Sequence, residues 1–269
     1  MIDELINMAL LNLQKKIGTH DPDDVDQIKH LEIRDSDVFV ATYPKSGERN
    51  TEGPAHTIGT REMFITAPSP RMRVTHLQPQ FMPLALSQRG KVIYVARNPK
   101  DVLVSYFYFH KMAKMLETPK DFNDFFEKFL RGDCENMFGC SWFDHIKAWY
   151  SVKDEMNMLF FTFEEMIQDL KSVVQRISLF LGKDLTNEEQ ANVVKHSTFK
   201  KMKDIPQANY KQVSEEMFNH QNGMFMRKGT IGDWKNHFTV AQNERFDQVF
   251  QKEMKDFPVS FIWDIKDIE

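Results

Sequence analysis

The chain has 269 residues, of which 41% are apolar, and its formal net charge is −4. That length and apolar content allow one large domain or two small ones. A mildly acidic chain argues against a nucleic-acid protein whose affinity rests on neutralising phosphates, so any basic site must be local. The two cysteines, Cys134 and Cys140, are too few for a disulfide framework and lack metal-ligand company, which predicts a reducing compartment.

The N-terminal segment, residues 1–36, opens with MIDELINMALLNLQKK, where acidic residues precede a short apolar run. It has neither the basic start of a signal peptide nor the length to span a bilayer. The chain contains no low-complexity linker and no internal repeat. We therefore expect one domain over residues 1–269 in a soluble, cytoplasmic protein with no membrane and no nucleic-acid partner.

The first strong element is the stretch Asp37–Gly47, DVFVATYPKSG. Its apolar run, Val38–Ala41, predicts a strand buried on both faces, as in a parallel sheet. Pro44 ends the strand, and Lys45–Gly47 then places a cation, a hydroxyl and a permissive backbone at its carboxyl end. One interpretation is a phosphate-binding loop. The other is an ordinary strand exit with a solvated lysine, because the Walker spacing of glycines is absent.

The middle of the chain alternates irregular, strand and helix patterns. Residues 48–70 are rich in Gly, Pro and Thr and predict an irregular region, followed by a short strand over Arg73–Leu77. Lys91–Ala96 predicts a second buried strand, and residues 100–115 predict an aromatic helix. Two further apolar stripes at helical spacing predict core-facing helices: Phe122, Phe125, Phe126 and Phe129, with Gly132 as the stop, and Trp142, Ile146 and Trp149.

The last part of the chain repeats the alternation. Met158–Phe163 predicts a third strand, and residues 165–181 predict one helix closed by Gly182. Thr186–Glu189 has the pattern of a capping box, and the final helix starts at Thr239. Strands that alternate with helices predict an α/β, three-layer, P-loop-like fold with a central, mainly parallel sheet flanked by helices.

Four polar stretches could meet at the carboxyl edge of such a sheet. They are Tyr43–Gly47, Arg97–Asp101 with Ser105 two helical turns further on, His76, and Phe225–Gly229 with its paired cations. An arginine that leaves a buried strand is a good bidentate phosphate ligand. Each stretch also has an ordinary alternative: a solvated lysine, a helix-capping turn, a structural histidine and a solvated charged loop. Together the four favour an anion site more than any one of them does.

The motifs in these stretches resemble those of the cytosolic sulfotransferases. The matching strings are TYPKSG, RNPKD with the later serine, HSTFKKMK, FMRKGTIGDWK and KNHFTVAQNE, and they run in order from about Val38 to Trp263. The RKGxxGDWK block is the most specific of them. The sequence strings FEEM, ANY and the terminal FIWDI are most similar to those of the amine sulfotransferase subgroup.

The resemblance implies a site for the sulfuryl donor 3′-phosphoadenylyl sulfate (PAPS). Lys45, Ser46 and Gly47 would hold its 5′-phosphosulfate. The 3′-phosphate would lie against Arg97, Ser105, Arg227, Lys228 and Gly229. The adenine pocket would be lined by Ser197, Phe199 and Met202, with Phe199 stacking on the base and Phe225 and Met226 beside it. Phe163 stands where the family often has tyrosine, so one hydroxyl contact would be missing.

The same resemblance assigns catalytic roles to His76 and Lys45. Sulfuryl transfer resembles phosphoryl transfer, an in-line displacement helped mainly by positioning and charge stabilisation. A neutral imidazole can take the proton from an acceptor hydroxyl or amine. A lysine can neutralise charge on the leaving phosphate oxygen. The sequence shows no ligand cluster for a metal, so no metal is expected.

The expected acceptor is a small phenol, alcohol or amine with an apolar body. Phe81, Tyr106 and Phe109 are candidate walls for it, and core packing is an equal alternative for the neighbouring Phe107. The KxxxTVxxxE pattern resembles the short dimerisation motif of the family, which implies a homodimer. Its residues here are Lys235, Thr239, Val240 and Glu244.

The chain departs from the family directly after the PKSG loop. The family continues with two threonines and a tryptophan, whereas this chain reads Glu48, Arg49 and Asn50. At about 4 Å and an effective dielectric near 20, a carboxylate would repel each phosphate charge by roughly 4 kcal/mol. Only 31 positions separate Lys45 from His76, which is short for the family's helix, acceptor loop and strand.

Two hypotheses follow from this departure. The first is a working sulfotransferase whose loop tolerates the substitution. The second is a sulfotransferase-fold isoform with impaired donor binding that acts as a non-catalytic binding or dimerisation partner. A P-loop kinase is disfavoured, because the Gly-Lys-Ser/Thr order and a magnesium-binding partner are missing.

Overall fold

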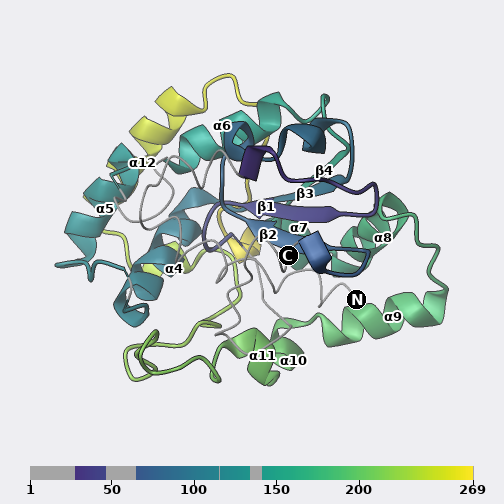
Figure 1. Ribbon diagram of the computed structural model, residues 1–269. Coiled ribbons are helices and arrows are strands. Elements are labelled where there is room, and N and C mark those ends of the chain that lie inside the picture. Colours follow the sequence, from purple (N-terminus) through teal and green to yellow (C-terminus); the bar gives the residue numbers. More distant parts are fainter. Residues whose placement is uncertain (1–27, 47–64, 115, 134–140, 269) are drawn as a thin grey trace.

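The computed structural model describes residues 28–46, 65–114, 116–133 and 141–268, and a four-stranded sheet lies at its centre (Figure 1). The strands are β1 (Val38–Thr42), β2 (Met72–Thr75), β3 (Lys91–Ala96) and β4 (Met158–Thr162). Their order across the sheet is β2-β1-β3-β4, and every pairing is parallel. The predicted buried strands at 38–41 and 91–96 are therefore confirmed as neighbours.

Alternate residues of each strand are buried on opposite faces of the sheet, because successive side chains point to opposite sides. Phe39 and Tyr94 belong to the larger core, whereas Val40, Ile93 and Val95 belong to the smaller one. Both sets are apolar, so the strands read as continuous hydrophobic runs, as expected of a sheet covered on both sides.

Nine α-helices and four 3₁₀ turns are present in the described part of the chain. The α-helices are α4 (Pro99–Met112), α5 (Phe122–Arg131), α6 (Trp142–Ser151), α7 (Phe163–Gln168), α8 (Leu170–Phe180), α9 (Asn187–His196), α10 (Phe199–Lys203), α11 (Pro206–Asn209) and α12 (Val240–Glu253). The 3₁₀ turns are η2 (Pro79–Phe81), η3 (Leu84–Ser87), η4 (Asp233–Asn236) and η5 (Ile265–Asp267).

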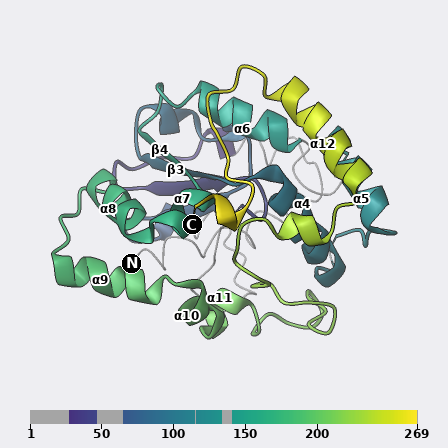
Figure 2. The same cartoon turned by 180° about the vertical axis from the view of Figure 1, so that it is seen from behind.

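The helices form a layer on each side of the sheet. The larger core joins the sheet to α4, α5, α6 and α12, and the smaller core joins it to α8. Figure 1 shows α6 and α12 on one side and α8 and α9 on the other, and Figure 2 shows the same layers from behind. The expected three-layer α/β arrangement is thus the observed one.

Local capping signals fix several helix ends as predicted. Gly132 ends α5 in the left-handed region at φ 74°, and Gly182 follows α8 at φ 72°. The hydroxyls of Thr186 and Thr239 accept from the third helical N–H of α9 and α12, each with a reciprocal side-chain bond. These bonds satisfy N–H groups that a helix end otherwise leaves unpaired.

Two predicted elements differ from the structure. The single helix expected over 165–181 is α7 and α8, separated at Asp169, whose φ is −147° and whose side chain caps the N–H of Ser172. An aspartate can compete with the helix for backbone N–H groups in this way. The strand expected over Arg73–Leu77 ends at Thr75, because the Thr75 hydroxyl accepts from the N–H of Leu77 and turns the chain.

Among the described residues, no helix combines the length and the apolar content needed to cross a bilayer.

Candidate active site

Residues at the ends of three neighbouring strands line one cavity. Lys45 follows β1 after a tight turn, and Arg97 and Phe163 directly follow β3 and β4. Parallel strands end at the same edge of a sheet, so residues far apart in sequence meet there. His76 directly follows β2 at the same edge.

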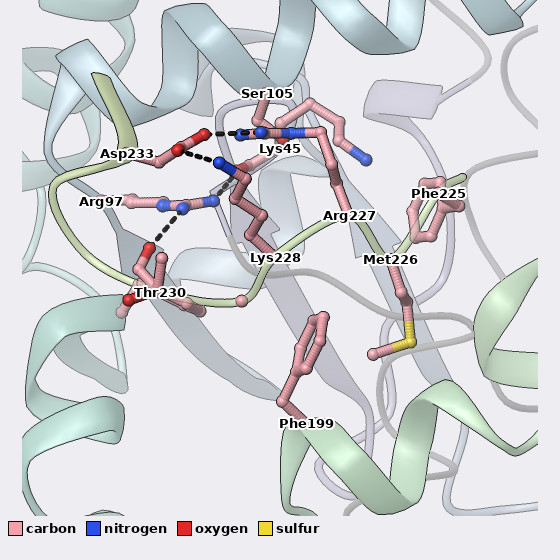
Figure 3. A pocket seen from close by; sticks show the side chains of 12 residues that line it. Lys45, Arg97, Ser105, Phe199, Phe225, Met226, Arg227, Lys228, Thr230 and Asp233 are labelled. Atoms are coloured by element: carbon pink, nitrogen blue, oxygen red, sulfur yellow. Dashed lines mark hydrogen bonds and ion pairs between the residues drawn. The ribbon is translucent and has the colours of Figure 1, made fainter. Parts of the chain in front are cut away.

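The cavity holds about 560 Å³ of empty space, including its open mouth. Its lining consists of Lys45, Arg97, Ser105, Phe163, Phe199, Phe225, Met226, Arg227, Lys228, Gly229, Thr230 and Asp233. Four of these side chains are cations and one is a carboxylate. Figure 3 shows the cationic groups gathered on one wall and Phe199 on the opposite one.

Lys45 occupies the third position of a turn that begins at Tyr43. The N–H of Ser46 donates to the Tyr43 carbonyl at 3.1 Å, and Lys45 has a φ of 70°. A positive φ after a proline is typical of the third residue of a type II turn, where glycine is preferred. A lysine in this conformation costs about 1–3 kcal/mol, and such residues cluster at functional sites. Its Nζ lies 3.5 Å from the centre of the Phe225 ring.

Arg97 joins the Lys45 turn to the later loop of the cavity. Its two terminal nitrogens donate to the carbonyls of Lys45 and Thr230, both at 3.2 Å (Figure 3). Its guanidinium carbon lies 4.3 Å from the centre of the Phe163 ring. Backbone carbonyls and a ring face thus orient the guanidinium and leave its charge without a carboxylate among these contacts.

Arg227 and Lys228 share one carboxylate. A terminal nitrogen of Arg227 and the Nζ of Lys228 each lie 2.5 Å from an oxygen of Asp233 (Figure 3). Burial alone would raise the pKa of Asp233, but hydrogen bonds from Lys228, Asn236 and Arg227 outweigh it and hold that pKa well below its usual range. Asp233 therefore stays ionised at neutral pH.

Gly229 allows Phe199 to reach the cavity. Gly229 has a φ of 62°, and a Cβ placed on it would lie 2.0 Å from Cδ2 of Phe199. No other residue fits both the backbone conformation and the ring. The predicted glycine of the RKG string is thus a contact surface for the aromatic side chain.

Most of the predicted nucleotide residues line this one cavity, and others lie behind it. Met202 packs with Met226 and Ala208 in a small apolar cluster, and Ser197 is the C-terminal cap of α9. Ser46 is fully buried next to Lys45. Gly47, Glu48, Arg49 and Asn50 lie outside the described residues, as does most of the 48–70 region.

Thr230 and Asp233 line the cavity but were absent from the predicted set. The signal was present, because both belong to the string FMRKGTIGDWK that suggested the loop. The expected anion contacts fell on the cations and glycine of this string. They did not include Asp233, which pairs with Arg227 and Lys228, or Thr230, whose carbonyl accepts from Arg97.

His76 lies in a separate, buried environment and is not among the cavity-lining residues. Its Nδ1 is 2.7 Å from the Thr42 carbonyl, and its own carbonyl lies 3.1 Å from Nε2 of His145. The Tyr94 hydroxyl lies 2.9 Å from Nδ1 of His145. Burial, with the neighbouring His76 as a smaller cause, lowers the pKa of His145 to about 3. These groups form a buried polar network.

Glu164 lies buried behind Arg97. One of its oxygens accepts from the backbone N–H of Asn98 at 2.8 Å and from the Asn98 side chain at 3.0 Å. Burial raises the pKa of Glu164 to about 7, against the opposing effects of these hydrogen bonds and the Arg97 charge.

The candidate acceptor residues lie close to these groups. Tyr106 is fully buried and its ring meets that of Tyr43 edge-on, while Phe109 lies 4.7 Å from Nζ of Lys45. Phe81 ends η2, a few residues beyond His76, and packs on the larger core. None of the three is among the residues that line the cavity.

The segment with the dimer-like pattern is at the surface. Val240 is 77% exposed at the start of α12, and Glu244 is exposed one turn later. Thr239 caps α12, and Lys235 pairs with Asp264. Within the described ranges, no group of three or more His, Cys, Asp or Glu side chains is placed to hold a metal ion.

Comparison with known proteins places this geometry in a family. The profile described as "Sulfotransferase domain" matches residues 51–258, so the chain belongs to the sulfotransferase family. The rabbit (Oryctolagus cuniculus) amine sulfotransferase is 44% identical over 270 residues, which cover 90% of this chain and 89% of the relative. The rat (Rattus norvegicus) sulfotransferase 2B1 is 39% identical and covers 92% of this chain and 79% of the relative.

A solved structure supports the same assignment. The crystal structure of mouse sulfotransferase SULT7A1, complexed with PAP, matches with a TM-score of 0.73 and 30% identity. The match covers 87% of this chain and 88% of the mouse chain. The resemblance inferred from the motifs, including the similarity to an amine sulfotransferase, is confirmed.

Proposed function

We propose that this protein transfers a sulfuryl group from PAPS to a hydroxyl or amine of a small apolar acceptor, with His76 as the base. The observation that carries the proposal is the gathering of Lys45, Arg97, Arg227 and Lys228 in one cavity opposite Phe199. A nucleotide with phosphates at two positions needs separate cations and a ring on which its base can stack. The PAP in the mouse relative supports a nucleotide of this kind.

Buried donors at the cavity fit an anionic nucleotide. The Nε atoms of Arg97 and Arg227 and the hydroxyl of Ser46 are buried and have no hydrogen-bond partner among the described residues. A buried donor without an acceptor costs about 1–3 kcal/mol, so two of them on cavity-lining arginines and one on the residue after Lys45 favour an incoming acceptor such as phosphate. Arginine is suited to this role because its N–H groups bind two phosphate oxygens at once.

We assign to these residues the roles that the family resemblance implies. Lys45, Ser46 and Gly47 would hold the 5′-phosphosulfate. Arg97, Ser105 and the segment Arg227–Gly229 would hold the 3′-phosphate. The adenine would lie against Phe199, with the remaining apolar walls supplied by Phe163, Ser197, Met202, Phe225 and Met226.

The contacts of His76 suit a base. A carbonyl oxygen only accepts hydrogen bonds, so the 2.7 Å contact with Thr42 requires the proton on Nδ1. The neutral ring then carries its lone pair on Nε2, which can take a proton from the acceptor.

Lys45 would stabilise the charge that forms on the leaving side. When bound, PAPS supplies the sulfuryl group that moves to the acceptor oxygen or nitrogen. Lys45 is 9% exposed, and the low dielectric of a buried site strengthens the interaction of its ammonium with a phosphate oxygen relative to water.

The remaining parts of the proposal rest on the family. Phe81, Tyr106 and Phe109 would form acceptor walls. The exposed start of α12 would meet its copy in a homodimer through Lys235, Thr239, Val240 and Glu244. The resemblance to cytosolic members supports a cytoplasmic protein folded as one domain over residues 1–269, acting in sulfate conjugation.

The test is a thermal-shift titration with adenosine 3′,5′-bisphosphate. Binding to the native state at 100 times Kd stabilises it by about 2.7 kcal/mol, so the melting temperature should rise by roughly 5 °C. Labelled PAPS with a panel of phenols, steroids and amines then identifies the acceptor. No shift at millimolar nucleotide rejects the enzyme and favours the non-catalytic isoform, in which Glu48 and its neighbours prevent donor binding.

A matched pair of glycine variants ties the shift to this cavity. Gly229→Ala should abolish the shift, because the new Cβ displaces Phe199. Gly223→Ala, which meets no atom within 4 Å, should leave it unchanged. Equal shifts in both variants would place the nucleotide elsewhere.

A further inference from the structure

A buried carboxylate fixes the loop that carries Arg227 and Lys228. The two oxygens of Asp101 accept from the backbone N–H groups of Gly232, at 2.8 Å, and Trp234, at 3.0 Å. These two residues flank Asp233 in the sequence. Asp101, at the start of α4, is 1% exposed, so it sets the backbone on both sides of Asp233 from inside the protein.

Asp101 is itself held by the residue that follows Arg97. The Asn98 side chain donates to an Asp101 oxygen at 2.8 Å, and its own oxygen accepts from the Asp101 N–H at 2.8 Å. Glu164 accepts from both the backbone and the side chain of Asn98. The end of β3, which positions Arg97, and the loop that carries Arg227 therefore share one anchor.

Asp233 connects this anchored loop backbone to the side chains of Arg227 and Lys228. Its carboxylate is 3% exposed and contacts Arg227 and Lys228 at 2.5 Å each, and it also accepts from Asn236 and lies 3.2 Å from His237. Adjacent cations repel each other, so a carboxylate between them is what allows both to occupy the cavity wall. Arg227 keeps other N–H groups, and Lys228 keeps other protons, for a second anion.

We propose that Asp101 and Asp233 act in series as positioning residues for the nucleotide phosphate. Asp101 fixes the backbone around Asp233, and Asp233 orients Arg227 and Lys228 toward the space that the phosphate enters. The proposal rests on the proposed function for the identity of the ligand. It adds two carboxylates as determinants of selectivity for the doubly phosphorylated form.

The first experiment tests the backbone contact without any ligand. Hydrogen–deuterium exchange of the full-length chain is followed in peptides that contain Gly232 and Trp234. Asp101→Asn leaves one acceptor oxygen for two N–H groups, so at least one of them should exchange ten times faster or more, while β1 and β3 peptides stay unchanged. Unchanged exchange at both positions, or equal acceleration over the whole chain, overturns the role of Asp101.

The second experiment measures selectivity. Dissociation constants are determined for adenosine 3′,5′-bisphosphate and adenosine 5′-monophosphate, and their ratio reports recognition of the extra phosphate. Asp233→Asn should lower this ratio at least tenfold, because the two cations no longer share a counter-ion. A merely structural role would weaken both nucleotides equally. Equal weakening, or a ratio that stays constant or rises, overturns the role of Asp233.

A control and a double variant complete the test. Asp247→Asn removes a carboxylate that lies 2.5 Å from another lysine, Lys100, outside the cavity, and it should leave the ratio unchanged. If Asp101 acts through Asp233, the double variant Asp101→Asn/Asp233→Asn should lower the ratio no further than Asp233→Asn alone. Additive losses would overturn the series arrangement.

Failure of the proposed function is recognised separately. A wild-type chain that binds neither nucleotide rejects the ligand, whereas the exchange experiment still decides whether Asp101 fixes the loop. Melting temperatures of all variants show whether any of them has lost the fold.

Discussion

Two polar regions lie at the same edge of the sheet and are built in opposite ways. The cavity collects the charged groups Lys45, Arg97, Arg227 and Lys228 around an open space, with one carboxylate among them. The region around His76 contains Thr42, Tyr94 and His145 and is buried, and burial lowers the pKa of His145. Arg97 and His76 each directly follow a strand of the same sheet, yet their environments differ in charge and in access to solvent.

This difference separates two tasks of the proposed reaction. Recognition of a phosphate needs fixed positive charge that faces the ligand. Proton removal needs an uncharged imidazole, and burial lowers the pKa of the neighbouring His145 because desolvation disfavours the charged form. Burial therefore has a different effect in each region. It orients the cations of the cavity, and it disfavours protonation of His145 in the region around His76. Four variants test this separation.

The largest effect is expected at His76. His76→Ala should lower kcat about 10³- to 10⁴-fold, because the variant lacks the general base, while the dissociation constant for adenosine 3′,5′-bisphosphate stays within about threefold. Initial rates with labelled PAPS and a thermal-shift titration measure the two quantities. His110→Ala is the control, since His110 is also buried with its Nδ1 2.9 Å from a backbone carbonyl. Turnover retained by His76→Ala would reject His76 as the base.

The strands and caps were predictable from the sequence because their signals are local. The apolar run Val38–Ala41, the stop at Gly132 and the capping box at Thr186 each depend on a few adjacent residues. The break at Asp169 was missed because an amphipathic stripe continues across it, and only the side chain's bond to Ser172 interrupts the helix.

The candidate site was predicted in part, for a related reason. Motif resemblance located the cations, and Asp233, the partner of Arg227 and Lys228, lies in the same string. The contacts that hold this loop in place are long-range, and no local pattern reveals them. Asp101 and Gly232 are 131 positions apart, and His145 lies on a helix whose aromatic stripe indicated only packing. The resemblance therefore identified most of the residues that line the cavity and missed those that hold them.

The second effect is a loss of folding stability in acid, caused by His145 in the buried region around His76. The pKa of His145 falls from 6.5 to about 3 on folding, so between these values the unfolded chain binds a proton that the native chain does not. Stability contributed by the neutral ring is therefore lost as the pH falls from 6.5 toward 3. Each tenfold change in proton affinity is about 1.4 kcal/mol, which makes the total roughly 5 kcal/mol.

Urea unfolding at several pH values measures this loss. His145→Gln should have a shallower fall in unfolding free energy below pH 6.5 than the wild type. Tyr94→Phe removes the hydroxyl partner of His145 without removing a titrating imidazole, and should lower stability by a similar amount at each pH. If His145→Gln and the wild type lose stability in parallel, His145 is not buried in its neutral form.

The third effect is a loss of folding stability as the pH rises, which is opposite in direction to the effect of His145. It arises at Glu164, beside the charged cavity. The pKa of Glu164 rises from 4.5 to about 7 on folding, so between these values the native chain binds the extra proton. Stability should fall by roughly 3 kcal/mol as the pH rises from 4.5 to 7. Glu164→Gln keeps an oxygen for the Asn98 donors and removes the titration. Its unfolding free energy should therefore lack this fall, and a fall equal to that of the wild type would contradict the assignment.

The smallest effect distinguishes a ligand contact from a structural one at Ser46. Its hydroxyl is buried without a partner among the described residues, so Ser46→Ala should stabilise the free protein by about 1 kcal/mol. The same change should weaken adenosine 3′,5′-bisphosphate binding about fivefold, because the hydroxyl can no longer donate to a phosphate oxygen. Ser178→Ala is the matched control, since its buried hydroxyl donates to the Gln175 carbonyl at 2.9 Å, and its loss should destabilise the protein and leave binding unchanged. A Ser46→Ala protein that is less stable, with unaltered nucleotide affinity, would show that this hydroxyl serves the fold alone.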